Sequence, residues 1–143
     1  MQIDHIAIAV RSVEAAAERL TGLLGSYRRT STVTNSRQQV NVLFLSRAGS
    51  LDIKLIEPSG ADSPLWGFVK RGEGLHHVCF KTPDVRSECE TLTAKGARVI
   101  APPEPGEAFD DHLIAFCYLG LGLNAEIIDT DARRGELDLA TPS

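Results

Sequence analysis

Residues 4–21, DHIAIAVRSVEAAAERLT, align without a gap on residues 76–93, HHVCFKTPDVRSECETLT, at an offset of 72 positions. At the same offset the segment LDIKLIE, 51–57, aligns on LNAEIID, 123–129. The aligned pairs include His5 with His77, Val13 with Val85, Glu18 with Glu90, Leu20 with Leu92, Thr21 with Thr93 and Phe44 with Phe116. Because the period is about half the chain, the sequence predicts two copies of one structural unit and little else.

Each copy has the pattern of a strand, a helix and then two or three more strands. The segments IDHIAIAV and LHHVCFKT are apolar and β-branched, which is typical of strands. Ser12 is the expected N-cap of a helix that ends at Gly25, and Pro83-Asp84 opens a second helix that ends at Gly96. Further strands are expected at 27–34, 39–46, 50–57, 98–101, 112–118 and 123–129. The pattern predicts an α+β fold of two βαβββ modules, related by pseudo-twofold symmetry, whose curved mixed sheets surround a cavity.

The two modules are expected to form one domain over residues 1–143. Its parts are module one at about 1–58, a linker helix at about 63–72, module two at about 73–130 and a flexible tail at 131–143. The linker helix is expected because Ser63-Pro64 combines an N-cap residue with proline at the first helical position. The acidic, proline-rich segment 101–111 is expected to be a loop, and the tail is expected to fray because it lacks apolar periodicity.

Length, charge and cysteine content exclude several classes of protein. The 143 residues suit a single globular domain, and a net charge of -4 does not favour nucleic acid or an anionic membrane surface as a partner. No apolar run is long enough to span a membrane, and the N-terminal segment lacks the basic start and cleavage site of a signal peptide. Cys79, Cys89 and Cys117 lack metal-type spacing. The chain is therefore expected to be cytoplasmic, with buried reduced thiols.

Four polar residues are expected to meet between the two modules. His5 and His77 hold equivalent positions on the first strand of each module, and Lys54 and Glu126 hold equivalent positions on the last strand. Two imidazoles and a carboxylate are a usual ligand set for a divalent metal. The alternative is that these groups are hydrogen-bonded core residues or point to solvent. Their equivalence in the two copies favours a functional cavity.

Other polar residues near these positions are candidates for substrate binding. Asp52 and Asn124 each lie two positions before Lys54 or Glu126, so they are expected to share the same face of the strand. His112 follows the acidic segment and is a candidate for the cavity mouth. His76 adjoins His77 and is expected to face the other way, as a surface or second-layer histidine.

Three segments carry a family resemblance: DHIAIAV at the start, SPLWGFVKRGEGLHHVCF in the middle and AEIID at the last strand. Over roughly residues 3–130 the chain resembles the methylmalonyl-CoA epimerase family, within the vicinal-oxygen-chelate (glyoxalase/bleomycin-resistance/dioxygenase) superfamily. The resemblance implies an isomerase, a CoA thioester as substrate and a homodimer. The central segment is its most specific part, since the two histidine strands alone mark only the superfamily.

The resemblance also implies a divalent metal (Co, Mn, Ni, Zn or Mg) held by His5, His77 and Glu126. The family's remaining ligand position, normally glutamine or glutamate, falls here on Lys54. An ammonium donates hydrogen bonds and accepts none, so it does not ligate a cation. Two outcomes follow: Lys54 swings out and leaves a three-ligand metal site, or it takes the place of the metal and pairs with Glu126. We favour the second outcome, a metal-free cavity.

The catalytic base expected from the resemblance is missing. The family uses a glutamate near the third strand of the first module, and here no Asp or Glu occurs between Arg19 and Leu51. Glu126 and Lys54 are therefore the predicted catalytic residues, with Glu126 or a histidine as the base. Arg28 and Arg29, in the same stretch, are candidates for binding the phosphates of a CoA-like tail. The alternative is that such arginines protect a solvated sheet edge.

Three functions remain open from the sequence. The first is an epimerase or isomerase that abstracts a proton next to a carbonyl. The second is a diverged cyclase or lyase of a biosynthetic pathway, and the third is a non-catalytic small-molecule binding or resistance protein. The fold alone does not choose among them.

Overall fold

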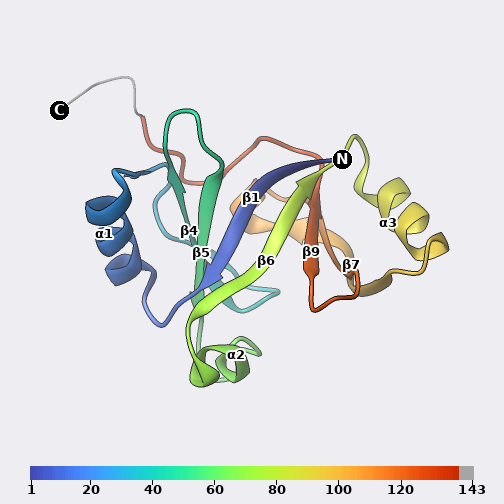
Figure 1. Ribbon diagram of the computed structural model, residues 1–143, viewed down its shortest axis with the longest axis horizontal. Coiled ribbons are helices and arrows are strands. Elements are labelled where there is room, and N and C mark those ends of the chain that lie inside the picture. The colour runs from blue at the N-terminus through green and yellow to red at the C-terminus, as the bar shows by residue number, and fades with distance from the viewer. Residues whose placement is uncertain (139–143) are drawn as a thin grey trace.

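The computed structural model describes residues 1–138, in which a nine-stranded mixed sheet is flanked by helices (Figure 1). The strands are β1 (Gln2–Ala9), β2 (Tyr27–Arg28), β3 (Val33–Asn35), β4 (Val40–Ser46), β5 (Asp52–Pro58), β6 (Gly74–Lys81), β7 (Arg98–Gly106), β8 (His112–Tyr118) and β9 (Asn124–Ile128). The helices are α1 (Val13–Leu24), α2 (Trp66–Arg71), α3 (Val85–Ala94) and the 3-10 turn η1 (Glu107–Phe109). The predicted α+β class is confirmed.

The two halves of the sheet have the same strand order. β1 and β6 pair antiparallel at the centre, followed outward by β5, β4 and β2 on one side and by β9, β8 and β7 on the other. The offset of 72 is kept in the register, because Ala7 of β1 pairs with Lys54 just as Cys79 of β6 pairs with Glu126. Each half has the predicted βαβββ order, and the short β3 is an addition to the first. The halves join into one continuous sheet instead of forming separate sheets.

Helices α1 and α3 pack on the same face of the sheet, one over each half (Figure 1). Leu55 of β5 lies in the core beneath α1, and Ala125 of β9 lies in the core beneath α3. Both predicted N-caps are present: Ser12 Oγ accepts from the Ala15 N–H at 3.1 Å, and Asp84 Oδ1 accepts from the Ser87 N–H at 2.8 Å. Because side chains alternate along strands, the opposite face is free to carry the polar residues.

Three predicted element boundaries were wrong. Segment 101–111 was expected to be a loop, but β7 continues to Gly106, because β7 is an edge strand and its prolines need no second ladder partner. The strand expected at 27–34 is broken into β2 and β3, which pair separately with β4. The linker helix was expected to begin at about residue 63, but it begins at Trp66. Ser63 belongs to a turn before the helix, in which its carbonyl oxygen accepts a hydrogen bond from the Trp66 N–H at 3.2 Å.

The expectation of a flexible tail was wrong for residues 131–138, which we call the C-terminal strap. The Arg134 N–H donates to the Ala108 carbonyl at 2.9 Å, and the Leu137 N–H donates to the Arg29 carbonyl at 2.8 Å. These bonds tie the strap to η1 on one side and to the segment after β2 on the other. Residues 139–143 of the predicted tail lie outside the described residues.

The cysteines and helices agree with the sequence expectations. Cys79, Cys89 and Cys117 are buried free thiols, as predicted. Among the helices of residues 1–138, none combines the length and apolar character needed to cross a membrane.

Candidate functional site

The four predicted polar residues converge on the sheet face opposite α1 and α3. His5 comes from β1, Lys54 from β5, His77 from β6 and Glu126 from β9, and all four are buried. Lys54 Nζ lies 3.1 and 3.0 Å from the two Glu126 carboxylate oxygens. The Nε2 atoms of His5 and His77 lie 3.1 and 3.3 Å from Glu126 Oε1. One carboxylate is thus surrounded by three nitrogen atoms, and we call these four residues the central cluster.

The neighbours of Glu126 keep it ionised. Burial alone raises its pKa, but the charge of Lys54 and the hydrogen bonds of His5 and His77 outweigh burial and hold the pKa of Glu126 well below its usual range. The Lys54 ammonium also lies 5.1 Å from the centre of the Phe109 ring, which favours a cation at that position. Lys54 and Glu126 therefore form a buried ion pair whose charges compensate each other.

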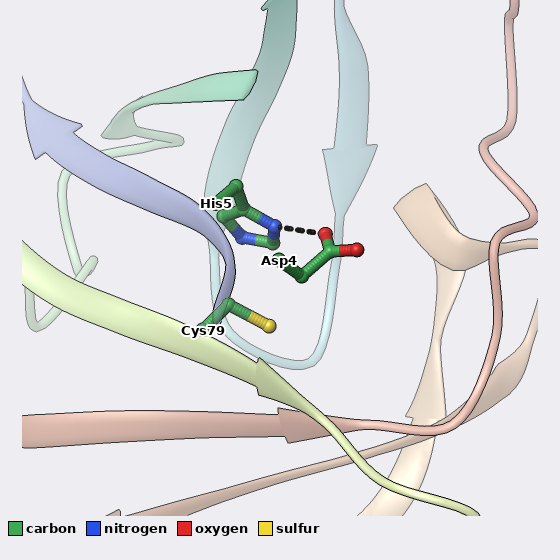
Figure 2. Close-up of side chains that lie close together, drawn as sticks. All are labelled: Asp4, His5 and Cys79. Carbon is green, nitrogen blue, oxygen red and sulfur yellow. Dashed lines mark hydrogen bonds and ion pairs between the residues drawn. The ribbon is translucent and has the colours of Figure 1, made fainter. Parts of the chain in front are cut away.

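His5 is held on its other side by Asp4, the residue before it. Figure 2 marks this contact, in which His5 Nδ1 lies 2.7 Å from Asp4 Oδ2. Cys79 of β6 lies beside the pair, and the three residues have potential ligand atoms within 4.8 Å of one another. Burial raises the pKa of the Cys79 thiol far above its ordinary value, so the thiol stays protonated. Asp4 and His5 form an orienting pair, and Cys79 fills space beside them.

His77 is held in a matching way by His76. Their two Nδ1 atoms lie 2.8 Å apart, so one ring donates a hydrogen bond to the other. Burial lowers the pKa of His77 to about 4 and also lowers the pKa of His76, so both rings are uncharged near neutral pH. The ring of His76 packs edge-on against Phe68 of α2, with ring centres 5.0 Å apart.

Two β-bulges explain why the residues before the histidines turn toward them. In the β1–β6 pairing the register shifts between Ile3 and His5, and again between Ala7 and Ile8, opposite Leu75 and His77. The extra residues at these shifts are Asp4 and His76, which are repeat-equivalent. A bulge breaks the strict alternation of side chains. The expectation that His76 faces away from His77 was therefore wrong.

The C-terminal strap adds a buried arginine to the cluster. Arg133 Nη2 donates to Asp4 Oδ2 at 2.7 Å, the same oxygen that contacts His5. Its guanidinium carbon lies 4.7 Å from the Phe44 ring centre and 4.6 Å from the Phe109 ring centre. Arg133 Nε is the only buried side-chain nitrogen or oxygen within residues 1–138 that lacks a hydrogen-bond partner. Arg133 therefore connects the strap to His5 through Asp4.

A pocket of about 320 Å³ opens beside the central cluster. Among the described residues, its titratable lining groups are Lys54, His76 and His77. The rest of the lining is apolar or carries amide groups: Gln38, Val40, Ile56, Pro64, Leu65, Phe68, Ile100, Ala101, Phe116 and Asn124. No carboxylate among the described residues lines this pocket. Glu126 is fully buried and influences the pocket through Lys54 and His77, which contact it.

Two predicted substrate-binding residues on the last strands have different surroundings. Asn124 lines the pocket. Asp52 does not: it accepts hydrogen bonds from Arg29 Nη1 and from Ser46 Oγ, both at 2.6 Å. Arg29 is also paired with Glu136 of the strap at 3.1 Å. The Asp52–Arg29 pair therefore anchors the strap, away from the pocket lining.

The remaining predicted substrate-binding residues also lie outside the pocket lining. Arg28 is paired with Glu14 of α1 at 2.7 Å. His112 is exposed, and its Nδ1 lies 2.9 Å from the Phe109 carbonyl oxygen. The structure therefore does not bring Arg28 or His112 together with the central cluster.

The three residues that the resemblance implies as metal ligands are only partly suited to a divalent metal here. His5, His77 and Glu126 offer ligand atoms within 4.8 Å of one another, and their chemistry suits a divalent cation. Asp4 also orients His5 in the way that partners of metal-binding histidines usually do. Lys54 opposes a metal, since its ammonium contacts both oxygens of the carboxylate that would have to ligate it. As they stand, these side chains do not fit a dication.

Sequence reasoning missed Asp4, Phe109 and Arg133. Asp4 and its contact with His5 depend on a bulge, which the alternation of side chains does not reveal. Arg133 lies in a segment without periodicity, and Phe109 lies in the segment expected to be a loop. The one usable signal was Phe109 itself, an aromatic residue within the acidic run EAFDD. Phenylalanine is among the residues most often buried in folded proteins.

Comparisons with known proteins agree with the fold. Residues 4–116 match the Glyoxalase/Bleomycin resistance protein/Dioxygenase superfamily. The chain is 32% identical over 106 residues to an ethylmalonyl-CoA/methylmalonyl-CoA epimerase of Cereibacter sphaeroides, covering 73% of this chain and 78% of that protein. It is 38% identical over 101 residues to the uncharacterized protein YqjC of Bacillus subtilis, covering 69% and 70%.

A solved structure gives the same result in three dimensions. A variant of Streptomyces coelicolor methylmalonyl-CoA epimerase in complex with 2-nitronate-propionyl-CoA superimposes with a TM-score of 0.79 and 29% identity. The superposition covers 92% of this chain and 99% of that one. Since the superfamily match spans residues 4–116, the chain belongs to the Glyoxalase/Bleomycin resistance protein/Dioxygenase superfamily.

Proposed function

We propose that this chain is an isomerase that removes and returns a proton on the carbon next to a thioester carbonyl, with methylmalonyl-CoA or a similar CoA thioester as substrate. The observation that carries the proposal is the pocket, where one fixed cation and two uncharged imidazoles stand among mostly apolar groups. Two of the similar proteins above are named as epimerases of such thioesters. A cation and a base on one pocket wall are what this reaction requires.

Lys54 is the group that stabilises the developing negative charge. Loss of the α-proton breaks the C–H bond, and its electron pair moves into the thioester to give an enolate oxygen. An ammonium has three N–H donors, and Lys54 directs two of them to Glu126. The third donor serves the enolate oxygen in the pocket. Because Glu126 already fixes the ammonium, little reorganisation is needed when the charge forms.

The pair His76 and His77 is the proton acceptor. With His76 Nδ1–H donating to His77 Nδ1, and His77 Nε2–H donating to Glu126, the Nε2 atom of His76 is unprotonated. This nitrogen accepts the α-proton, and Glu126 stabilises the resulting positive charge through His77. A water molecule in the pocket donates a proton to the opposite face of the enolate and so inverts the carbon, and His76 passes the proton it accepted to the hydroxide left behind. The sequence left Glu126 and a histidine as candidates for the base; in this assignment a histidine is the base and Glu126 is a positioning residue.

The pocket volume limits which part of the substrate it holds. About 320 Å³ is near the lower end for small-molecule sites, so it suits the acyl group and thioester. The nucleotide end then lies outside. Binding of its phosphates by Arg28 and Arg29 stays a prediction, as do the homodimer and the cytoplasmic location.

The test is exchange of solvent deuterium into the α-carbon of methylmalonyl-CoA, followed by mass spectrometry. The unmodified protein should exchange far above the buffer rate. His76→Gln should reduce exchange by about 100-fold or more, the usual contribution of a positioned base. Arg86→Gln, an exposed change on α3, is the matched control and should exchange normally. No exchange by the unmodified protein, beside an active epimerase in the same assay, refutes the proposal.

A non-catalytic binding protein is the second candidate. It is favoured by one observation, the absence of a carboxylate from the pocket lining within residues 1–138. Saturable binding of methylmalonyl-CoA without any exchange would select this candidate over the isomerase.

A further inference from the structure

We infer that the Lys54 ammonium takes the place of a divalent cation among His5, His77 and Glu126. The site then keeps a positive charge without binding a metal. The inference concerns the charge of the central cluster and holds whatever the substrate is. It goes beyond the proposed function, because metal binding is measurable without any substrate.

The first argument is that Lys54 occupies the ligand atoms of Glu126. The two N···O distances are 3.1 and 3.0 Å, and the side chains of both residues are almost fully buried. A metal at Glu126 would have to displace the ammonium from both oxygens. Phe109 lies over Lys54, with its ring centre 5.1 Å from Nζ, so the ammonium is enclosed by an aromatic face as well.

The second argument is charge balance among the buried groups. Lys54 is paired with Glu126, and Arg133 is paired with Asp4 at 2.7 Å. The two cations and two carboxylates sum to zero. A dication placed among them adds two positive charges that no described neighbour compensates. Uncompensated charge in a buried site is strongly unfavourable.

The third argument is that the remaining framework is still that of a metal site. His5 and His77 both turn Nε2 toward Glu126, and each has its Nδ1 held by the preceding residue, Asp4 or His76. Such outer support normally fixes metal-binding imidazoles. Removing the charge of Lys54 should therefore be enough to create a metal site.

The test compares unmodified protein with Lys54→Gln, using Co²⁺ alone as the probe. Glutamine removes the ammonium and supplies an amide oxygen beside Glu126. Lys54→Gln should bind Co²⁺ at least about 100-fold more tightly than unmodified protein, a conservative figure for removing a cation next to a dication. The visible absorption of protein-bound Co²⁺ reports coordination. Lys95→Gln, an exposed change after α3, is the control and should bind no better than unmodified protein.

Two measurements on the unmodified protein keep the inference testable even when the variant does not fold. Protein expressed in medium with added Co, Mn, Ni and Zn should contain far less than one equivalent of metal by plasma mass spectrometry. Its melting temperature should be the same in EDTA and in excess Co²⁺. Any of three results overturns the inference. The first is stoichiometric metal that stays bound through dialysis, and the second is a clear rise of the melting temperature with Co²⁺. The third is a folded Lys54→Gln variant whose affinity for Co²⁺ is no higher than that of unmodified protein. None of these results depends on deuterium exchange, so the proposed isomerase reaction stands or fails separately.

Discussion

Replacing Arg133 with alanine tests the role of the C-terminal strap most directly. The sequence places Arg133 and Arg134 side by side in a segment expected to be flexible. In the structure the Arg133 side chain is 1% exposed and pairs with Asp4, while the Arg134 side chain is 39% exposed and pairs with Asp110 and Asp111. The two adjacent arginines therefore form a matched pair, in which one is buried and the other is not.

Arg133→Ala should destabilise the protein because it leaves the Asp4 carboxylate without its partner cation. Removing one partner of a buried ion pair costs about 3–5 kcal/mol, because the other charge stays buried. The Asp4 side chain is 15% exposed, which relieves part of this cost, and loss of the unpaired Nε offsets a little more. Loss of packing on Phe44 and Phe109 acts in the opposite direction. We expect a net loss of about 3 kcal/mol in the free energy of unfolding.

The assay is thermal unfolding followed by circular dichroism, with urea titration to confirm the free energy. For a domain of this size a loss of about 3 kcal/mol lowers the melting temperature by roughly 10 °C. Arg134→Ala should have a much smaller effect, since solvent screens its ion pairs. Arg133→Lys should lower the melting temperature by less than Arg133→Ala and by more than Arg134→Ala, because an ammonium keeps the charge but does not stack on the rings as the planar guanidinium does. Equal effects of Arg133→Ala and Arg134→Ala would refute the assignment of Arg133 as a buried anchor.

Two further predictions concern the strap. Gly135 has φ 73°, and a Cβ added there would collide with the Ser31 hydroxyl. Gly135→Ala should therefore lower the free energy of unfolding by about 1–2 kcal/mol, measured by chemical denaturation. The control is Gly22→Ala, on an open helix surface, which should not destabilise the protein. Burial alone raises the pKa of Asp4, but the hydrogen bond of His5 and the charge of Arg133 outweigh burial and hold that pKa below its usual value. A depressed carboxylate pKa gives stability that is present above the unfolded value and lost as pH falls through the folded value. The difference in melting temperature between unmodified protein and Arg133→Ala should therefore be constant above about pH 5 and should become smaller below about pH 4. A difference that stays constant down to about pH 3 would contradict the assignment of Asp4 as the partner of Arg133.

The sequence repeat predicted correctly which residues meet at the centre of the sheet, because an alignment without gaps keeps the same strand register in both halves. Lys54 and Glu126 are repeat-equivalent, and their neighbours Ala7 and Cys79 are paired to them in the same way. Helix ends with side-chain caps, at Ser12 and Asp84, were also predictable from local sequence. These features depend on short-range chemistry or on periodicity, which a sequence displays.

Features that depend on long-range pairing were not predictable. The edge position of β7 decides that its prolines are tolerated, and nothing in segment 101–111 reveals that position. Burial of Arg133 depends on the rings of Phe44 and Phe109, which lie far from it in the sequence. The bulges at Asp4 and His76 arise only when β1 pairs with β6.

These bulges and the repeat together explain why a lysine is compatible with this site. Pairing of β1 with β6 brings repeat-equivalent residues from β5 and β9 to within 3.1 Å of each other, so the side chains at 54 and 126 must interact directly. Two carboxylates at that separation would repel by about 5 kcal/mol at an effective dielectric of about 20, unless a cation lay between them. A lysine opposite Glu126 removes the repulsion without a metal. The bulged Asp4 and His76 still orient both histidines toward the carboxylate, so the geometry of the cluster is kept while the source of its positive charge changes.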